Sequence, residues 1–408
     1  MLKYIDGGVC AAQGFRAAGI HVGVKTHAAW KKDVALIVSD VDCAAAAMFT
    51  TNVVKAAPIH VDRKHLADGK ARAIVANSGN ANACAPQGEE NAEKMCAAAA
   101  AAIGCKPEDV LVSSTGVIGQ TLKVGVIEEG MPALYAALEH SEAASDAAAH
   151  AIMTTDTVKK EAAVETVIGG KTVRLGGIAK GSGMIHPNMG TMLCFLTTDC
   201  AISPEMIRAA LLETVQVSFN RISVDGDTST NDSCIVLANG LAGNAPITDK
   251  GADYQAFAEA LKTLCTLLAK KMASDGEGAK HLITCTVTGA KSEASAETIA
   301  KSVISSTLTK AAIFGADANW GRVLCAMGYS GEAFDPDKVD VSFASAAGEI
   351  AVCAQGRGLD FDEDKAKKIL TEHDVEIRVT MGEGGAACTC WGCDITYDYI
   401  KINGDYRT

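Results

Sequence analysis

The 408-residue sequence lacks two features that mark large classes of proteins, a long apolar run and an excess of basic residues. A membrane-spanning helix needs about 18 consecutive apolar residues, and no stretch of the sequence is that long. The N-terminal segment also has no apolar block typical of a signal peptide. The 49 acidic residues outnumber the 37 basic ones, which gives a formal net charge of −12. This balance disfavours nucleic acid and anionic membranes as partners. We therefore expect a cytoplasmic protein that acts on a small molecule.

Common nucleotide and metal motifs are also missing. The glycine-rich run at 180–183 does not have the GxxxxGK[ST] spacing of a phosphate loop, and the nine histidines form no HExxH or HxxxH pair. The segment CTCWGC holds three closely spaced cysteines, but no second cluster has matching zinc spacing. We predict no metal and no cofactor, and we expect most of the 15 cysteines to be packed thiols. A metal-binding protein built around Cys388, Cys390 and Cys393 stays open as an alternative.

Helix-like and strand-like stretches alternate irregularly, which predicts mixed α/β layers rather than a strict βαβ repeat. We expect strands at 32–37, 72–77, 111–113, 172–179, 191–198, 233–238, 282–288, 339–344, 348–353, 374–380 and 395–402. We expect helices at 90–103, 128–139, 142–153, 204–216, 253–273 and 294–310. A chain of this length exceeds one typical core, so a smaller C-terminal α/β subdomain is expected from about residue 280.

The most informative bond is Gly190–Thr191, which lies between a glycine-rich polar run and a strand-like apolar run. If this bond breaks, Thr191 becomes an N-terminus whose amine lies beside its own hydroxyl. A free α-amine has a reference pKa of about 7.7–8.0 and can act as the base for that nucleophile. Gly190 suits a cleavage site because glycine tolerates a strained backbone. Taken alone, the pattern also fits an ordinary Gly-Thr step that enters a buried strand.

A second candidate element is SSTGVIG at 113–119, which ends a strand-like run. The Thr115 hydroxyl and the backbone N–H of Gly116 are two donors of the kind that an oxyanion hole needs. A tight turn after a strand explains the same residues.

Eight ordered segments carry a resemblance that covers the whole chain. They are NSGNANAC (77–84), SSTGVIG (113–119), MTTDT (153–157), KGSGMIHPNMGTML (180–193), SVDGDTSTNDS (223–233), DGEGAKHL (275–282), FGADANWGRV (314–323) and WGCDITYDYIKINGDYRT (391–408). On these segments the chain resembles the ornithine acetyltransferases, the bifunctional glutamate N-acetyltransferase and amino-acid acetyltransferase enzymes of arginine biosynthesis.

The resemblance implies a role for each matching residue. Thr191 is the nucleophile, released when the precursor cuts itself after Gly190, and Thr115 and Gly116 stabilise the oxyanion. The residues that match substrate contacts are Thr154, Lys180, Thr191, Glu277, Asn403 and Thr408. Without the resemblance, Lys180 and Glu277 would be read as solvated surface charges. Asn403 and Thr408 would be read as an ordinary tail.

The resemblance also implies the fold and the reaction. The fold is an α/β, N-terminal-nucleophile-type αββα sandwich with a smaller α/β subdomain, assembled from an alpha chain (1–190) and a beta chain (191–408). The enzyme moves an acetyl group from N2-acetyl-L-ornithine to L-glutamate through acetyl-Thr191, and two alpha and two beta chains form a heterotetramer. The alternative is a self-processing aminopeptidase or amide hydrolase of related fold, in which water replaces glutamate.

Some properties stay open at this point. Gly190 stands where the family more often has alanine, and the position of His186 is commonly smaller, so the rate of processing is open. His186 is interpreted as a loop histidine. Whether acetyl-CoA serves as a second donor, and whether feedback inhibition occurs, is likewise open, because related enzymes with different donors share the catalytic segments.

Overall fold

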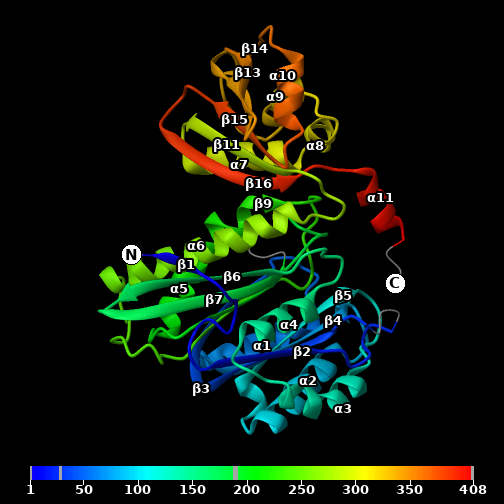
Figure 1. The fold of residues 1–408 in the computed structure, drawn as a ribbon, viewed down its shortest axis with the longest axis vertical. Helices are drawn as coiled ribbons and strands as arrows, with labels where there is room; N and C mark the ends of the chain where they lie inside the picture. The colour runs from blue at the N-terminus through cyan, green and yellow to red at the C-terminus, as the bar shows by residue number, and fades with distance from the viewer. Residues whose placement is uncertain (1, 27–29, 187–191, 406–408) are drawn as a thin grey trace.

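The computed structural model describes residues 2–26, 30–186 and 192–405, and within these residues the strands form two separate sheets (Figure 1). The strands of the larger sheet are β1 (Lys3–Ile5), β2 (Phe15–Ile20), β3 (Val34–Phe49), β4 (Lys70–Asn80), β5 (Val110–Val117), β6 (Lys160–Ile168), β7 (Lys171–Lys180), β8 (Leu193–Thr198) and β10 (Ser233–Ala238). The helices packed on it are α1 (Ala57–His65), α2 (Gly88–Ile103), α3 (Val124–Ala136), α4 (Glu142–Ile152), α5 (Pro204–Val217) and α6 (Ala252–Ser274).

The larger sheet folds into two layers because the long strand β3 belongs to both. The order is β1-β6-β7-β8-β10-β3-β4-β5, and β2 also pairs with β3. The first half of β3, residues 34–38, pairs with β2 and β4, whereas residues 44–49 pair with β10. An irregularity between Val38 and Cys43 separates the two halves. Such a bulge bends and twists a strand, which lets one strand pass from layer to layer.

Strand alternation shows how the layers are stacked. On β8, Leu193 and Phe195 enter the core between the two β-layers, while Cys194 and Leu196 pack toward α5 and α6. The same period of two sends alternate side chains of β3 into that inner core. The others face outward, toward α1, α2 and α3 in residues 34–38 and toward α5 at Ala46 and Met48. The alanine face of α4 also enters the inner core. The result is the αββα arrangement that the resemblance predicted.

The second sheet has its own core and lies above the first in Figure 1. Its strands are β9 (Ile222–Ser223), β11 (Leu282–Ala290), β12 (Asp340–Ser345), β13 (Gly348–Ala354), β14 (Arg357–Gly358), β15 (Asp374–Thr380) and β16 (Ala386–Cys393), in the order β14-β13-β12-β15-β11-β16-β9. Its helices are α7 (Glu293–Ser305), α8 (Thr307–Phe314), α9 (Trp320–Gly328) and α10 (Glu363–Leu370), and α11 (Tyr397–Gly404) follows the last strand. Helix α6 contacts both β6 of the first sheet and β16 of the second.

Two predicted elements differ from the structure. The strand predicted at 395–402 is wrong, because these residues begin α11, whose start is capped by the Thr396 hydroxyl. The single helix predicted at 294–310 is two helices. Ser306 interrupts it with an extended backbone and uses its hydroxyl to accept a hydrogen bond from the backbone N–H of Thr309, which is the N-cap of α8.

None of the helices in the described part of the chain combines the length and the apolar character needed to cross a bilayer.

Candidate active site

A cavity of about 320 Å³ brings together site residues that are far apart in the sequence. Its lining includes every described residue that the sequence predicted for catalysis or substrate binding, namely Thr115, Gly116, Thr154, Lys180, Glu277 and Asn403. Gly190, Thr191 and Thr408 lie outside the described residues. A larger cavity of about 840 Å³ lies between β3, α1 and α5, and none of the described site residues lines it. The described residues of the predicted site therefore line the cavity of about 320 Å³.

The two predicted oxyanion donors lie at the end of β5, where this strand runs parallel to β4. The register becomes irregular at Asn80, which faces both Thr115 and Val117. Gly116 has a φ of +132°, and a Cβ built there would lie 2.4 Å from the carbonyl carbon of Gly79. Only glycine fits so close to a neighbouring strand in this backbone region. Thr115, Gly116 and Val117, at this end of β5, line the cavity.

Polar side chains hold this strand end in place. The Ser114 hydroxyl donates to Asn77 Oδ1 at 2.6 Å, and the Asn231 amide donates to the carbonyl oxygens of Ala81 and Ser114 at 2.6 and 2.8 Å. Asn231 itself lines the cavity and is buried. The loop before β10 therefore ties the end of β5, which carries Thr115, to the residue that follows β4.

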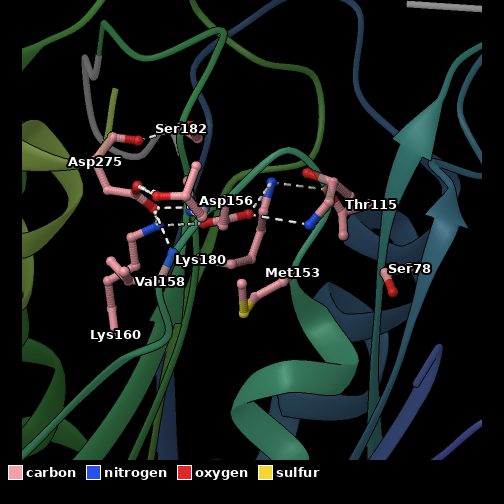
Figure 2. Close-up of polar contacts among 12 residues, drawn as sticks. Ser78, Thr115, Met153, Asp156, Val158, Lys160, Lys180, Ser182 and Asp275 are labelled. Carbon is pink, nitrogen blue, oxygen red and sulfur yellow. Dashed lines mark hydrogen bonds and ion pairs between the residues drawn. The ribbon is translucent and has the colours of Figure 1, made fainter. Parts of the chain in front are cut away.

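The carboxylate of Asp156 joins two other parts of the site. It accepts hydrogen bonds from the backbone N–H groups of Thr154, at 3.0 Å, and Gly181, at 2.8 Å, and lies 4.0 Å from the ammonium of Lys180. Thr154 follows the end of α4, and Lys180 is the last residue of β7. Figure 2 shows Lys180 between Asp156 and Thr115, and the Lys180 ammonium donates to Thr115 Oγ1 at 3.4 Å.

The ion pairs continue behind Asp156 into the protein interior. The fully buried Lys160 ammonium lies 2.5 Å from carboxylate oxygens of both Asp156 and Asp275. Asp275 also accepts hydrogen bonds from the backbone N–H groups of Thr157 and Val158 and from the Thr157 hydroxyl. Two carboxylates and two ammonium groups thus alternate in a buried chain that ends at Thr115 (Figure 2). We call Asp275, Lys160, Asp156 and Lys180 the charge chain.

The pKa values reflect this environment. Burial alone would raise the pKa of Asp156, but the ammonium groups of Lys180 and Lys160 hold it well below its ordinary value. Burial lowers the pKa of Lys180, and the nearby Asp156 carboxylate opposes that shift. The ionised state of each group in this pair therefore depends on the other.

Glu277 and Asn403 form the other wall. Glu277 is buried in the turn after α6, where its backbone N–H donates to the carbonyl oxygen of Ser182 at 3.0 Å. The Asn403 amide, on α11, donates to Glu277 Oε2 at 2.7 Å. The Ser182 hydroxyl donates to the carbonyl oxygen of Asp275 at 2.6 Å, so this wall is tied to the charge chain. The cavity consequently holds a cation and an anion on different elements.

A smaller cavity of about 30 Å³ adjoins the same residues and is lined by Thr115, Lys180, Met192 and Asp232, among others. Asp232 is buried, and its Oδ2 atom has no hydrogen-bond partner among the described residues. Burial raises the pKa of this carboxyl group well above its ordinary value, although Lys180 opposes the shift.

His186 precedes the proposed cleavage bond in the sequence, and its Nδ1 atom lies 3.0 Å from the Ser223 hydroxyl. Burial and the charge of Lys301 lower the pKa of His186 to about 4, so its ring is neutral near pH 7.

Cys388, Cys390 and Cys393 are not among the residues that line either of these two cavities. Cys388 and Cys390 face the core of the second sheet, and Cys393 faces the core next to α6. Across the residues that the structure describes, no group of three or more histidine, cysteine, aspartate or glutamate side chains is arranged to hold a metal ion.

A family model decides which proteins this chain is related to. The model of the ArgJ family matches residues 16–408. The chain belongs to the ArgJ family. The arginine biosynthesis bifunctional protein ArgJ of Symbiobacterium thermophilum is 51% identical over 408 residues, with 100% of each chain covered. The ArgJ 1 protein of Clostridium acetobutylicum is 49% identical, with 97% of this chain and 96% of that one covered.

Solved structures from the ArgJ family were also found. One is the ornithine acetyltransferase of Mycobacterium tuberculosis complexed with ornithine, which is 37% identical. It covers 46% of this chain and 99% of that one, with a TM-score of 0.42.

Sequence reasoning missed the inner part of this ArgJ-family site. Asp156 and Asp275 lie in MTTDT and DGEGAKHL, two of the segments that carried the resemblance, so their presence there was the available signal. Lys160 had no such signal, because a lysine at the start of a strand is usually a solvated charge. Its complete burial becomes apparent only when α6 brings Asp275 to β6.

Proposed function

We propose that this ArgJ-family chain transfers the acetyl group of N2-acetyl-L-ornithine to L-glutamate through an acetyl-Thr191 intermediate. The observation that carries the proposal is the single cavity that gathers Thr115, Gly116, Thr154, Lys180, Glu277 and Asn403. An amino-acid substrate carries a carboxylate and an ammonium group, which call for a cation and an anion in the same site. Lys180 and Glu277 supply these charges.

In the first half-reaction, the neutral α-amine of Thr191 takes the proton of the Thr191 hydroxyl as Oγ attacks the acetyl carbonyl. The resulting oxyanion accepts hydrogen bonds from the Thr115 hydroxyl and the N–H of Gly116. The C–N bond then breaks, the α-ammonium returns the proton to the departing amine, and ornithine leaves. Thr191 stays acetylated as an ester.

In the second half-reaction, the neutral amine of L-glutamate attacks this ester. A proton passes from the attacking nitrogen to the Thr191 α-amine and then to Thr191 Oγ as the C–O bond breaks. N-acetyl-L-glutamate leaves and the free nucleophile is restored, so the kinetics are ping-pong. We propose no metal and no cofactor for these steps.

We propose acetyl-CoA as a second donor for the same acetyl-Thr191 intermediate. The word bifunctional in the names of the ArgJ relatives supports this extension.

The nucleophile arises by self-cleavage between Gly190 and Thr191, which leaves an alpha chain of residues 1–190 and a beta chain of residues 191–408. We propose that two copies of each form a cytoplasmic heterotetramer. In this scheme, Thr154, Lys180, Glu277, Asn403 and Thr408 bind the amino-acid substrate together with Thr191.

Intact-mass spectrometry of the denatured protein, before and after addition of N2-acetyl-L-ornithine, tests the proposal. We expect two fragments, of which the one that begins at Thr191 gains one acetyl group. The Thr191→Ala variant should give one uncut chain that gains none. An uncut wild-type chain that never becomes acetylated would contradict the proposal. Release of acetate without glutamate, at the rate of transfer with glutamate, would instead indicate the hydrolase.

A further inference from the structure

The buried carboxylate of Asp156 contacts several residues of the proposed site at once. Its Oδ2 atom accepts the N–H of Thr154 and lies 4.0 Å from Lys180, while Oδ1 accepts the N–H of Gly181 and lies 2.5 Å from Lys160. The Asp156 side chain has no exposed surface. It therefore connects two substrate-binding positions, Thr154 and Lys180, without facing the solvent.

Thr115 needs a defined orientation to act on an oxyanion. A threonine hydroxyl has one proton to donate and two lone pairs with which to accept. The Lys180 ammonium has only donors, so its contact with Thr115 Oγ1 at 3.4 Å occupies a lone pair of the hydroxyl. The single proton of Thr115 is then left for another acceptor. The cavity that Thr115 and Gly116 line is where the oxyanion of the proposed reaction forms.

We propose that Asp156 is a positioning residue for acetyl transfer, which keeps the Lys180 ammonium charged and directed at Thr115 so that the Thr115 proton faces the oxyanion. This inference rests on the proposed function and adds a second role to Lys180. Asp156 itself acts through Lys180 and through the backbone of Thr154.

The charges around Lys180 determine how this arrangement responds to pH. Among the residues that the structure describes, the charged groups that act on it are Asp156, Lys160, Glu277, Asp232 and Lys25. Burial is the largest influence and favours the neutral amine, and Asp156 is the strongest opposing charge. Removing the charge of Asp156 therefore lowers the pKa of Lys180 further. An opposite charge at 4–6 Å typically shifts a pKa by about one to three units.

The role of Asp156 is tested by measuring how kcat depends on pH. Activity requires a neutral α-amine at Thr191, which sets the acidic limb, and a charged Lys180, which sets the alkaline limb. In Asp156→Asn, we expect the alkaline limb to move to lower pH by about one to three units, while the acidic limb stays in place. At the optimum, between the acidic and the alkaline limbs, kcat of the variant should fall about 10²-fold, the usual effect of a disturbed oxyanion donor.

Asp275→Asn is the matched control. It makes the same chemical change in the same buried charge chain and removes the other carboxylate of Lys160, but among the described residues Asp275 forms no hydrogen bond or ion pair with Lys180 or Thr115. We expect this variant to unfold at lower temperature and to keep the alkaline limb of the wild type. Equal displacement of the limb in both variants, or in neither, would overturn the inference.

Maturation is separated from positioning by a second experiment. If Asp156→Asn fails to cut itself, Asp156→Asn and Lys180→Met are combined in a Thr191→Ala background, where every chain stays uncut. Thermal unfolding of the four combinations should show that Asp156→Asn destabilises much less when Lys180 is already Met. Independent effects of the two changes would overturn the inference. A wild-type enzyme that never transfers acetyl would instead reject the proposed function.

Discussion

Gly116 shows at the scale of one residue how the backbone determines the chemistry of this site. Its φ of +132° and its approach to Gly79 both exclude a side chain, and its neighbour Thr115 contacts Lys180. The sequence identified this pair from a glycine after a strand-like run. It could not show the irregular pairing with Asn80 at the strand end that lines the cavity.

Gly116→Ala should lower kcat for acetyl transfer by about 10²-fold, because the new Cβ would lie 2.4 Å from the carbonyl carbon of Gly79 and would displace an oxyanion donor. Gly119→Ala is the control. Gly119 also has a positive φ, of +81°, but a Cβ there meets no atom within 4 Å. Steady-state kinetics and melting temperatures of both variants test this, and equal losses of kcat would contradict a specific role for Gly116.

Helix α11 is the element that sequence analysis interpreted wrongly and that the site depends on. Residues 395–399 alternate apolar and polar side chains, and the whole run 395–402 is rich in Ile and Tyr, which explains the prediction of a strand. Tertiary contacts favour the helix: the Thr396 hydroxyl caps its start and also donates to the carbonyl oxygen of Gly278 at 2.7 Å. Since the turn that holds Gly278 also holds Glu277, the helix is fixed beside the residue that Asn403 contacts.

Gly278→Ala should therefore weaken substrate binding. Gly278 has a φ of +69°, and an added Cβ would lie 2.7 Å from Asp398 Cβ and 2.8 Å from the backbone nitrogen of Tyr399, which would push α11 away from Glu277. We expect KM for acetylornithine to rise about tenfold or more, as for the loss of one hydrogen bond to a charged group, with a smaller change in kcat. Gly331→Ala, at a φ of +91° with no atom within 4 Å of the new Cβ, provides the control for backbone strain. Equal KM values in the two variants would refute the role of α11.

Sequence patterns predicted correctly the elements in which apolar residues follow a clear helical or strand spacing along the whole element. The strand at 233–238 and the helices predicted at 253–273 and 204–216 agree with β10, α6 and α5 within a residue or two. Short helices such as α1 and α10 were not predicted, because few residues carry their periodicity. The same limit applies to the site: motifs identified its residues, whereas burial of Lys160 and the pairing of Asp156 with Lys180 depend on long-range packing.

For the molecule as a whole, the proposed cleavage falls in the connection between two paired strands. Residues 175–180 of β7 pair with residues 193–198 of β8, and β10 pairs with residues 44–49 of β3. In one sheet, β8 and β10 from the second fragment therefore lie between β7 and β3 from the first, and α6 covers β6 and β7. Both fragments also contribute to the cavity, since Thr115 and Lys180 come from the first and Glu277 and Asn403 from the second.

The two fragments should therefore remain together after cleavage and unfold as one unit. Separating them would break the pairing of β8 with β7 and of β10 with β3, and would expose the apolar core that lies between the β-layers. We expect the cleaved wild type and the uncut Thr191→Ala variant to elute together in native size-exclusion chromatography, and the cleaved protein to melt in a single transition. Denaturing conditions should release the two fragments from the wild type only. Fragments that separate without denaturant, or that melt independently, would show that the connection between β7 and β8 holds the sheet together.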